Sequence, residues 1–139
     1  MRVLFDTNVI LDVLFRREPF VATAAALWQA NEDKLFEGYV AGITPVNVFY
    51  IAAKIKGAGA ARAAVRELLD AFRVCPIDAT ILQSALALPL RDYEDAVQHA
   101  SAVASQMDVI VTRDTRDYAG ATLFVLTPQD FLDQLNRQV

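Results

Sequence analysis

Two short apolar segments, each followed closely by an aspartate, most constrain what this chain can fold into. The first is Val3–Phe5, followed by Asp6, and the second is Val109–Val111, followed by Asp114. Both are continuous runs of β-branched or apolar residues without alternation, which is typical of parallel strands buried on both faces. In an open parallel sheet, functional groups collect beyond the carboxyl ends of the strands. The two aspartates therefore predict a shared carboxylate pocket at that end of the sheet.

The rest of the chain alternates strand and helix patterns. The predicted strands are Arg2–Asp6, Gly38–Ile43, Val74–Pro76, Val109–Val111 and Leu123–Leu126. The predicted helices are Val9–Phe15, Phe20–Asn31, Thr44–Ile55, Ala60–Phe72, Asp78–Pro89, Asp92–Met107 and Thr127–Arg137, with caps expected at Thr44, Asp78, Asp92 and Thr127. This order predicts an α/β fold with three α/β/α layers around a parallel sheet of about five strands. At 139 residues, we expect one domain spanning 1–139.

Composition narrows the class of protein without deciding its function. The net charge of −4 is unlike that of a general nucleic-acid binder, although a local basic rim can coexist with an acidic metal site. The single cysteine, Cys75, excludes an internal disulfide and lies in an apolar stretch, so we expect a buried thiol and a cytoplasmic setting. The longest uncharged run, Gly38–Ala53, is shorter than the ~18 residues of a membrane span.

Four aspartates are the candidate catalytic residues: Asp6, Asp95, Asp114 and Asp117. Each has a simpler interpretation, since Asp6 can cap a helix, Asp114 and Asp117 can stabilise a turn, and Asp95 ends a capping-box pattern. Together, however, these interpretations require separate caps that converge on one side of one sheet. We therefore expect the aspartates to form a cluster.

Clustered carboxylates need a compensating charge. Two of them repel each other by about 4 kcal/mol at ~4 Å and an effective dielectric constant of ~20. A hard cation cancels this repulsion, so we expect Mg²⁺ or Mn²⁺, which activates water for attack on a phosphodiester. Zinc is disfavoured because the chain has one histidine and one cysteine. The histidine, His99, lies one turn after Asp95, and we expect it to be a partly exposed surface residue.

Three segments resemble the motifs of the PIN domain family: Phe5–Ile10, Asp92–Ala96 and Val111–Tyr118. PIN domains are metal-dependent ribonucleases that include the VapC-type toxins of bacterial and archaeal toxin–antitoxin pairs. The resemblance continues to Leu132 and is closest to the branch with an Asp-Phe-Glu-Asp-like string, which here contains Tyr93. It implies the same α/β fold and an endoribonuclease activity.

The resemblance also implies roles for individual residues. The metal ligands would be Asp6, Asp95 and Asp114, the further catalytic acid Asp117, and the polar supporters Asn8 and Thr112. Many PIN domains have a glutamate where this chain has Asn47, another supporting residue, whose amide adds no negative charge. Asp12 either extends the cluster or faces away from it. Asp92 and Glu94 are expected to be a helix cap and a residue of the site's rim.

Partners follow from the same resemblance: an RNA substrate, a small antitoxin protein and a second copy of the chain in a homodimer, with no membrane. Basic residues flanking the site are candidates for RNA phosphate contact or for ordinary salt bridges, namely Arg16, Arg17, Lys54, Arg113 and Arg116. The segment Ala60–Phe72 corresponds to an arm used for dimerisation and antitoxin docking in similar proteins. Its apolar face is equally well explained by core packing.

The sequence therefore predicts the toxin of a type II toxin–antitoxin pair, which hydrolyses RNA with metal-activated water. One alternative is a non-catalytic or weakly active domain that binds RNA or a partner, because Asn47 replaces an acid. Another is a phosphatase with Asp6 as nucleophile. Phosphatases of the aspartyl-phosphate type use a second aspartate two residues later and a lysine near the late acids. This chain has Asn8, Arg113 and Arg116 at those places.

Overall fold

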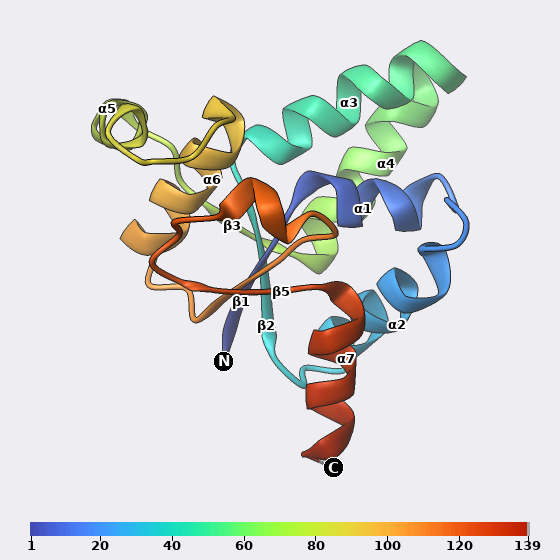
Figure 1. Ribbon diagram of the computed structural model, residues 1–139. Helices are drawn as coiled ribbons and strands as arrows, with labels where there is room; N and C mark the ends of the chain where they lie inside the picture. Colours follow the sequence, from blue (N-terminus) through green and yellow to red (C-terminus); the bar gives the residue numbers. More distant parts are fainter. Residues whose placement is uncertain (139) are drawn as a thin grey trace.

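The computed structural model describes residues 1–138, which form a parallel sheet between layers of helices (Figure 1). The strands are β1 (Arg2–Phe5), β2 (Glu37–Ala41), β3 (Arg73–Cys75), β4 (Val109–Val111) and β5 (Phe124–Leu126). The five strands lie in the order β3-β2-β1-β4-β5, and every neighbouring pair is parallel. The chain thus builds one half of the sheet outward from β1 and returns to build the other half from β4. This reversal places a topological switch between β1 and β4, where sites commonly form.

The helices are α1 (Thr7–Leu14), α2 (Val21–Glu32), α3 (Ile43–Lys56), α4 (Ala58–Ala71), α5 (Ala79–Leu86), α6 (Tyr93–Ala104) and α7 (Pro128–Arg137), with a 3₁₀ turn η1 (Thr115–Tyr118). In Figure 1, α5 and α6 cover one face of the sheet, while α1, α2, α4 and α7 lie on the other. The predicted three-layer α/β/α architecture is confirmed. No helix within residues 1–138 is both long and apolar enough to cross a bilayer.

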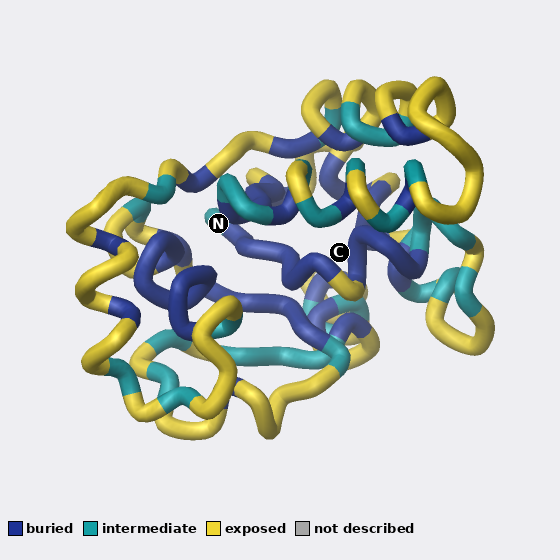
Figure 2. Tube along the Cα trace, turned by 90° about the horizontal axis from the view of Figure 1, so that it is seen from above, coloured by how far each residue is buried: buried dark blue, intermediate teal, exposed yellow. Residues whose placement is uncertain are grey.

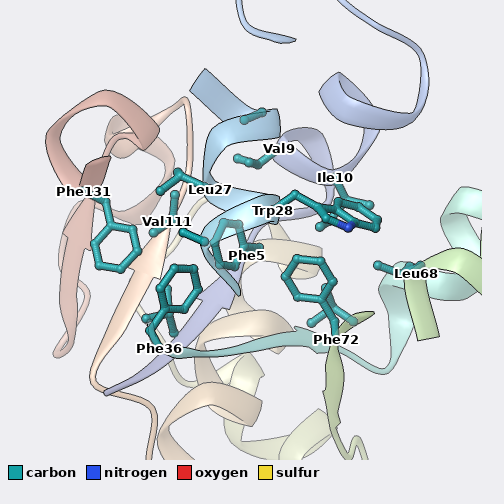
Figure 3. Packing of buried hydrophobic residues seen from close by; sticks show 14 of the residues in the cluster. Phe5, Val9, Ile10, Leu27, Trp28, Phe36, Leu68, Phe72, Val111 and Phe131 are labelled. Carbon is teal, nitrogen blue, oxygen red and sulfur yellow. The ribbon is translucent and has the colours of Figure 1, made fainter. Parts of the chain in front are cut away.

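Side chains of β1 alternate between the two cores. Val3 and Phe5 belong to a cluster with α1, α2, α4 and α7, whereas Leu4 packs with α6 on the opposite face. Phe5 lies 5.8 Å from Phe36 and 5.3 Å from Phe72 between ring centroids, within the group of aromatic rings in Figure 3. Figure 2 likewise shows the central strands buried and the outer turns of the helices exposed. Burial on both faces is the reason that the strand sequence is apolar without alternation.

Three predicted helix caps are confirmed by side-chain hydrogen bonds. Asp78 accepts from Ile81 N, Asp92 from Asp95 N, and Thr127 from Asp130 N, at 2.9, 3.0 and 3.1 Å. Each bond satisfies one of the free N–H groups in the first turn of a helix. Pro128 is the first residue of α7, as expected.

The predicted cap at Thr44 is wrong. α3 already begins at Ile43, and Thr44 lies fully buried in its first turn. Its hydroxyl is 2.8 Å from the hydroxyl of Thr7, so the side chain bonds to the start of α1 rather than to its own helix. A buried hydroxyl needs a partner, and the neighbouring helix provides one. The start of α3 is thereby tied to the start of α1.

Other boundaries differ by a few residues. The break between α3 and α4 is narrower than expected, because Gly57 alone separates them and Gly59 is helical. Gly57 has φ of +89°, a conformation that residues with a Cβ rarely adopt, and this suffices to reverse the chain. Cys75 is buried as a free thiol, as predicted.

Candidate active site

A cavity of about 450 Å³ opens beyond the carboxyl end of β1. Five acidic residues line it, contributed by the start of α1, the start of α6 and η1. They are Asp6, Asp92, Glu94, Asp95 and Asp117. Asn8 and Asn47, predicted to support the site, also line this acidic pocket, as does Tyr50 from α3. The sheet topology thus brings together groups that are more than a hundred residues apart in sequence.

Two side chains from other parts of the fold, one on α6 and one after β4, hold the Asp6 carboxylate. Thr112 Oγ1 donates to its Oδ2 at 2.7 Å, and Gln98 Nε2 donates to its Oδ1 at 3.2 Å. Asp6 stands at the N-cap position of α1, yet its side chain makes no capping bond to that helix. The simple cap interpretation of Asp6 is therefore wrong. Both donors are neutral, so they orient the carboxylate without cancelling its charge.

Gln98 was missed by the sequence analysis. It is fully buried on α6, three residues after Asp95, and therefore on the same side of that helix. That spacing was the available signal, because a polar residue on the face of a candidate acid points toward the same site. Within residues 1–138, its Oε1 atom is buried without a hydrogen-bond partner.

Asp95 has the most perturbed carboxyl group of the pocket. Burial, the largest cause, and the charges of four neighbouring acids together raise its pKa to about 7; these acids are Asp6, Asp92, Asp117 and Glu94. Its Oδ1 lies 3.5 Å from the hydroxyl of Tyr118, whose own pKa is raised by burial and by these acids, so the phenol stays neutral and donates. The capping bond of α6 comes from Asp92, not from the Asp95 carboxylate. Asp95 is thus an acid in a site that disfavours its ionisation.

Of the two late acids, Asp117 lines the pocket and Asp114 does not. Asp114 occupies the N-cap position of η1, and its N–H donates to Thr112 Oγ1 at 3.2 Å. One turn of 3₁₀ helix later, Asp117 faces the acids, and burial together with the charges of Asp114 and Asp6 raises its pKa. The role of Asp114 as a metal ligand stays a prediction.

The donor set is suited to a hard cation. Mg²⁺ prefers oxygen ligands and is commonly bound through a few carboxylates and several waters. The pocket offers carboxylates and amide oxygens, and the pKa of Asp95 is raised first by burial and then by the negative charges of four neighbouring acids. Within residues 1–138, no three acidic, histidine or cysteine side chains converge in a ready-made metal-binding arrangement. The carboxylates that would hold an ion fit Mg²⁺ or Mn²⁺ by their chemistry, with waters completing the shell.

Asn47 contacts another residue of the pocket. Its Nδ2 donates to Glu94 Oε1 at 2.8 Å, joining α3 to the first turn of α6. Burial raises the pKa of Glu94, the charges of Asp92 and Asp6 add to this, and the bond from Asn47 opposes it. Glu94 was expected at the rim of the site. The structure agrees, because Glu94 is exposed, lines the pocket and pairs with the amide.

Asp12 faces away from the pocket. Its side chain is 1% exposed and lies 2.7 Å from Arg113 Nε and 4.0 Å from Arg17. The contact with Arg113 is an ion pair whose angles are poor for a hydrogen bond. The Arg113 guanidinium also lies over the Phe20 ring, 4.0 Å from its centroid. For Arg113 and Arg17, the salt-bridge alternative to RNA contact therefore applies.

The remaining basic candidates, Arg16, Lys54 and Arg116, are exposed, and none of them lines the pocket.

The prediction for His99 is wrong, because this side chain is 1% exposed and its Nε2 accepts a hydrogen bond from Thr122 N at 3.0 Å. Burial lowers its pKa. Every residue from Ala96 to Ala102 is buried, since α6 is covered by α5 as well as by the sheet. The exposed face assumed from sequence does not exist there.

Known proteins resemble the chain in sequence and in fold. The family profile described as PIN domain matches residues 2–116, whereas no curated protein matches. A toxin–antitoxin complex from Klebsiella pneumoniae contains a chain that is 29% identical, with a TM-score of 0.67 over 91% of this chain and 97% of that one.

Two more distant structures share the fold. FitAcB from Neisseria gonorrhoeae is 23% identical, with a TM-score of 0.70 over 91% of this chain and 98% of that one. VapC20 of Mycobacterium tuberculosis, described as a sarcin–ricin loop cleaving toxin, is 17% identical, with a TM-score of 0.67 over 84% and 93%. The family match spans most of the sequence and all of the acidic pocket except Asp117. The chain therefore belongs to the PIN domain family.

Proposed function

We propose that this protein is an Mg²⁺- or Mn²⁺-dependent endoribonuclease and the toxin of a type II toxin–antitoxin pair. The observation that carries the proposal is the acidic pocket, in which Asp95 has a pKa raised to about 7 by burial and by four neighbouring acids. A protein gains no stability from such a cluster on its own, so its retention is best explained by a cation that the cluster binds.

Asp6, Asp95 and Asp117 line the pocket and would hold the ion, with Asp114 as the further candidate beside Asp117. When bound, the ion would supply Lewis-acid chemistry, lowering the pKa of a water and offsetting the negative charge of a phosphodiester. Thr112 and Gln98 orient the Asp6 carboxylate through neutral hydrogen bonds. Tyr118 donates to Asp95 and fixes that carboxylate at the pocket.

The relatives support the biological part of the proposal. One solved relative comes from a toxin–antitoxin complex and another is described as a toxin that cleaves the sarcin–ricin loop, which is RNA. By analogy, the partners of this chain are an RNA substrate, a small antitoxin protein and a second copy of itself. Arg16, Lys54 and Arg116 are exposed and available for phosphate contacts.

A weakly active or non-catalytic RNA-binding domain is the second candidate, because Asn47 brings no charge to the pocket. The phosphatase alternative is less well supported. Asn8 stands two residues after Asp6, where the aspartyl-phosphate type uses a second acid, and no lysine lines the pocket within residues 1–138.

The test compares cleavage of a generic RNA with hydrolysis of a phosphate monoester, each with Mn²⁺ and with EDTA. The wild type should cleave RNA only with the metal. Asp95→Asn should abolish cleavage while the protein stays folded, and Asp70→Asn, which removes an exposed acid of α4, should behave like the wild type. RNA cleavage in EDTA, or full activity of Asp95→Asn, would contradict the metal mechanism. Hydrolysis of the monoester alone would favour the phosphatase.

A further inference from the structure

Within residues 1–138, a single side-chain hydrogen bond joins α3 to α6, and it is formed by Asn47 and Glu94. Both residues line the acidic pocket, and the distance from Nδ2 to Oε1 is 2.8 Å. The amide therefore fixes one carboxylate oxygen of Glu94. A carboxylate accepts several hydrogen bonds or metal contacts through its two oxygens, so Oε2 is left for another ligand.

We propose that Glu94 is an additional acidic ligand of the pocket's cation, directly or through a bound water, and that Asn47 positions it from α3. The inference rests on the proposed metal-dependent function and specifies how this chain supplies the charge that Asn47 lacks. The acid is carried by α6 and its neutral partner by α3. Because one residue is acidic and the other neutral, this wall of the pocket holds one negative charge.

Glu94 is exposed at the edge of the pocket, and its charged neighbours are acids. Within residues 1–138, no lysine or arginine forms an ion pair with it. The charges that act on Glu94 are those of Asp92 and Asp6, which are both negative. Asn47 is the group that stabilises the Glu94 carboxylate here, and its amide cannot offset those charges.

The arrangement also explains why an amide suits position 47. A glutamate there would bring a second carboxylate toward Glu94 across a contact that is now 2.8 Å. Two carboxylates at such a distance share a proton or require a cation between them. With Asn47, the site orients its acid at no cost in added repulsion.

The experiment measures Mn²⁺ binding to the full chain by titration calorimetry, with thermal melts to establish folding. Glu94→Gln should weaken binding by about 10- to 100-fold, the range for losing a group that ligates or orders a metal shell. Asn47→Ala should weaken it less and leave the melting temperature of the metal-free protein nearly unchanged. Glu67→Gln, which removes an exposed glutamate of α4, is the matched control and should bind like the wild type.

The double variant Asn47→Glu/Glu94→Gln returns the acid to α3 and should recover most of the lost affinity. Wild-type affinity in Glu94→Gln, or no recovery in the double variant, would overturn the inference while leaving the proposed function intact, provided that the wild type binds Mn²⁺ and cleaves RNA. A wild type that neither binds Mn²⁺ nor cleaves RNA would overturn both.

Discussion

Replacing Arg113 with alanine tests how the loop that carries the late acids is held. Arg113 is the nearest cation to Asp12, at 2.7 Å, and Arg17 is farther away at 4.0 Å. The Asp12 side chain is 1% exposed, and burial raises its pKa despite the opposing charge of Arg113. In Arg113→Ala, the buried Asp12 carboxylate loses its main partner, and the ion pair that joins α1 to the loop after β4 is lost.

The expected cost follows from this geometry. Removing one partner of a buried ion pair typically costs about 3–5 kcal/mol, because the other charge stays buried without compensation. Here Arg17 remains, and the Arg113 side chain is 28% exposed, so water screens part of the interaction. The lost contact with the Phe20 ring adds about 0.5–1 kcal/mol. We expect a loss of about 3 kcal/mol in the free energy of unfolding at pH 7.

The loss should depend on pH with a defined sign. Without Arg113, the pKa of Asp12 in the folded protein rises further above its unfolded value of ~3.9. Between these two values the folded variant binds a proton that the unfolded chain does not bind, so its stability falls as pH rises. The difference between variant and wild type should therefore be smaller at pH 4.5 than at pH 7.

Urea unfolding followed by tryptophan fluorescence measures this, because Trp28 is the only tryptophan and packs at 4.9 Å against Phe72 in the core. Arg116→Ala, an exposed arginine of η1, is the control and should change stability by less than ~0.5 kcal/mol. A cost for Arg113→Ala no larger than that of the control, or one that is the same at both pH values, would refute the reasoning.

Three further predictions concern the pocket and its supports. Asp95→Asn should stabilise the metal-free protein by roughly 1–2 kcal/mol at pH 8, after allowance for screening, and by little at pH 4. The reason is that the wild type loses this stability as pH rises through about 7, the raised pKa of Asp95. Urea melts of both proteins at the two pH values test this prediction. Thr112→Val should cost about 1.5–3 kcal/mol in the same assay, because the Oδ2 atom of Asp6 loses a charge-assisted hydrogen bond; a cost under ~0.5 kcal/mol would contradict it. His99→Gln should flatten the loss of stability below pH ~6.5, because burial lowers the pKa of His99 and the unfolded wild type binds a proton there first; an unchanged acid slope would refute this.

The parts of the fold that could be predicted are those with local signals. Val3–Phe5 and Val109–Val111 are continuous apolar runs, and this pattern follows directly from burial on both faces of the sheet. The caps at Asp78 and Asp92 have their bonding partner only three residues away, so the local sequence suffices to find them. Thr44 has the same composition signal, but its partner Thr7 lies on another helix, and the local pattern was misleading.

The parts of the site that could not be predicted depend on pairings across the fold. Gln98 bonds to Asp6 from 92 residues away, and Asn47 bonds to Glu94 across 47 residues. Both pairings follow only once α6 and α3 are placed beside the carboxyl end of β1. The distinction between Asp114 and Asp117 depends on where η1 begins, because Asp114 is its N-cap with a non-helical backbone and Asp117 lies inside the turn and lines the pocket.

The placement of charge around α1 gives the pocket its character. Asp6 is the N-cap of α1 and Asp12 lies in its last turns, and the two side chains face different sides of the helix: Asp6 lines the pocket, whereas Asp12 does not. Asp12 receives the cations Arg113 and Arg17, while Asp6 receives the neutral donors Thr112 and Gln98. The two arginines thus pair with the buried acid outside the pocket, Asp12, whereas the pocket acid, Asp6, is oriented by neutral donors that leave its charge in place. A pocket held rigid yet left negative is what a site for a divalent cation requires, because the ion then meets oriented ligands whose charge is still available.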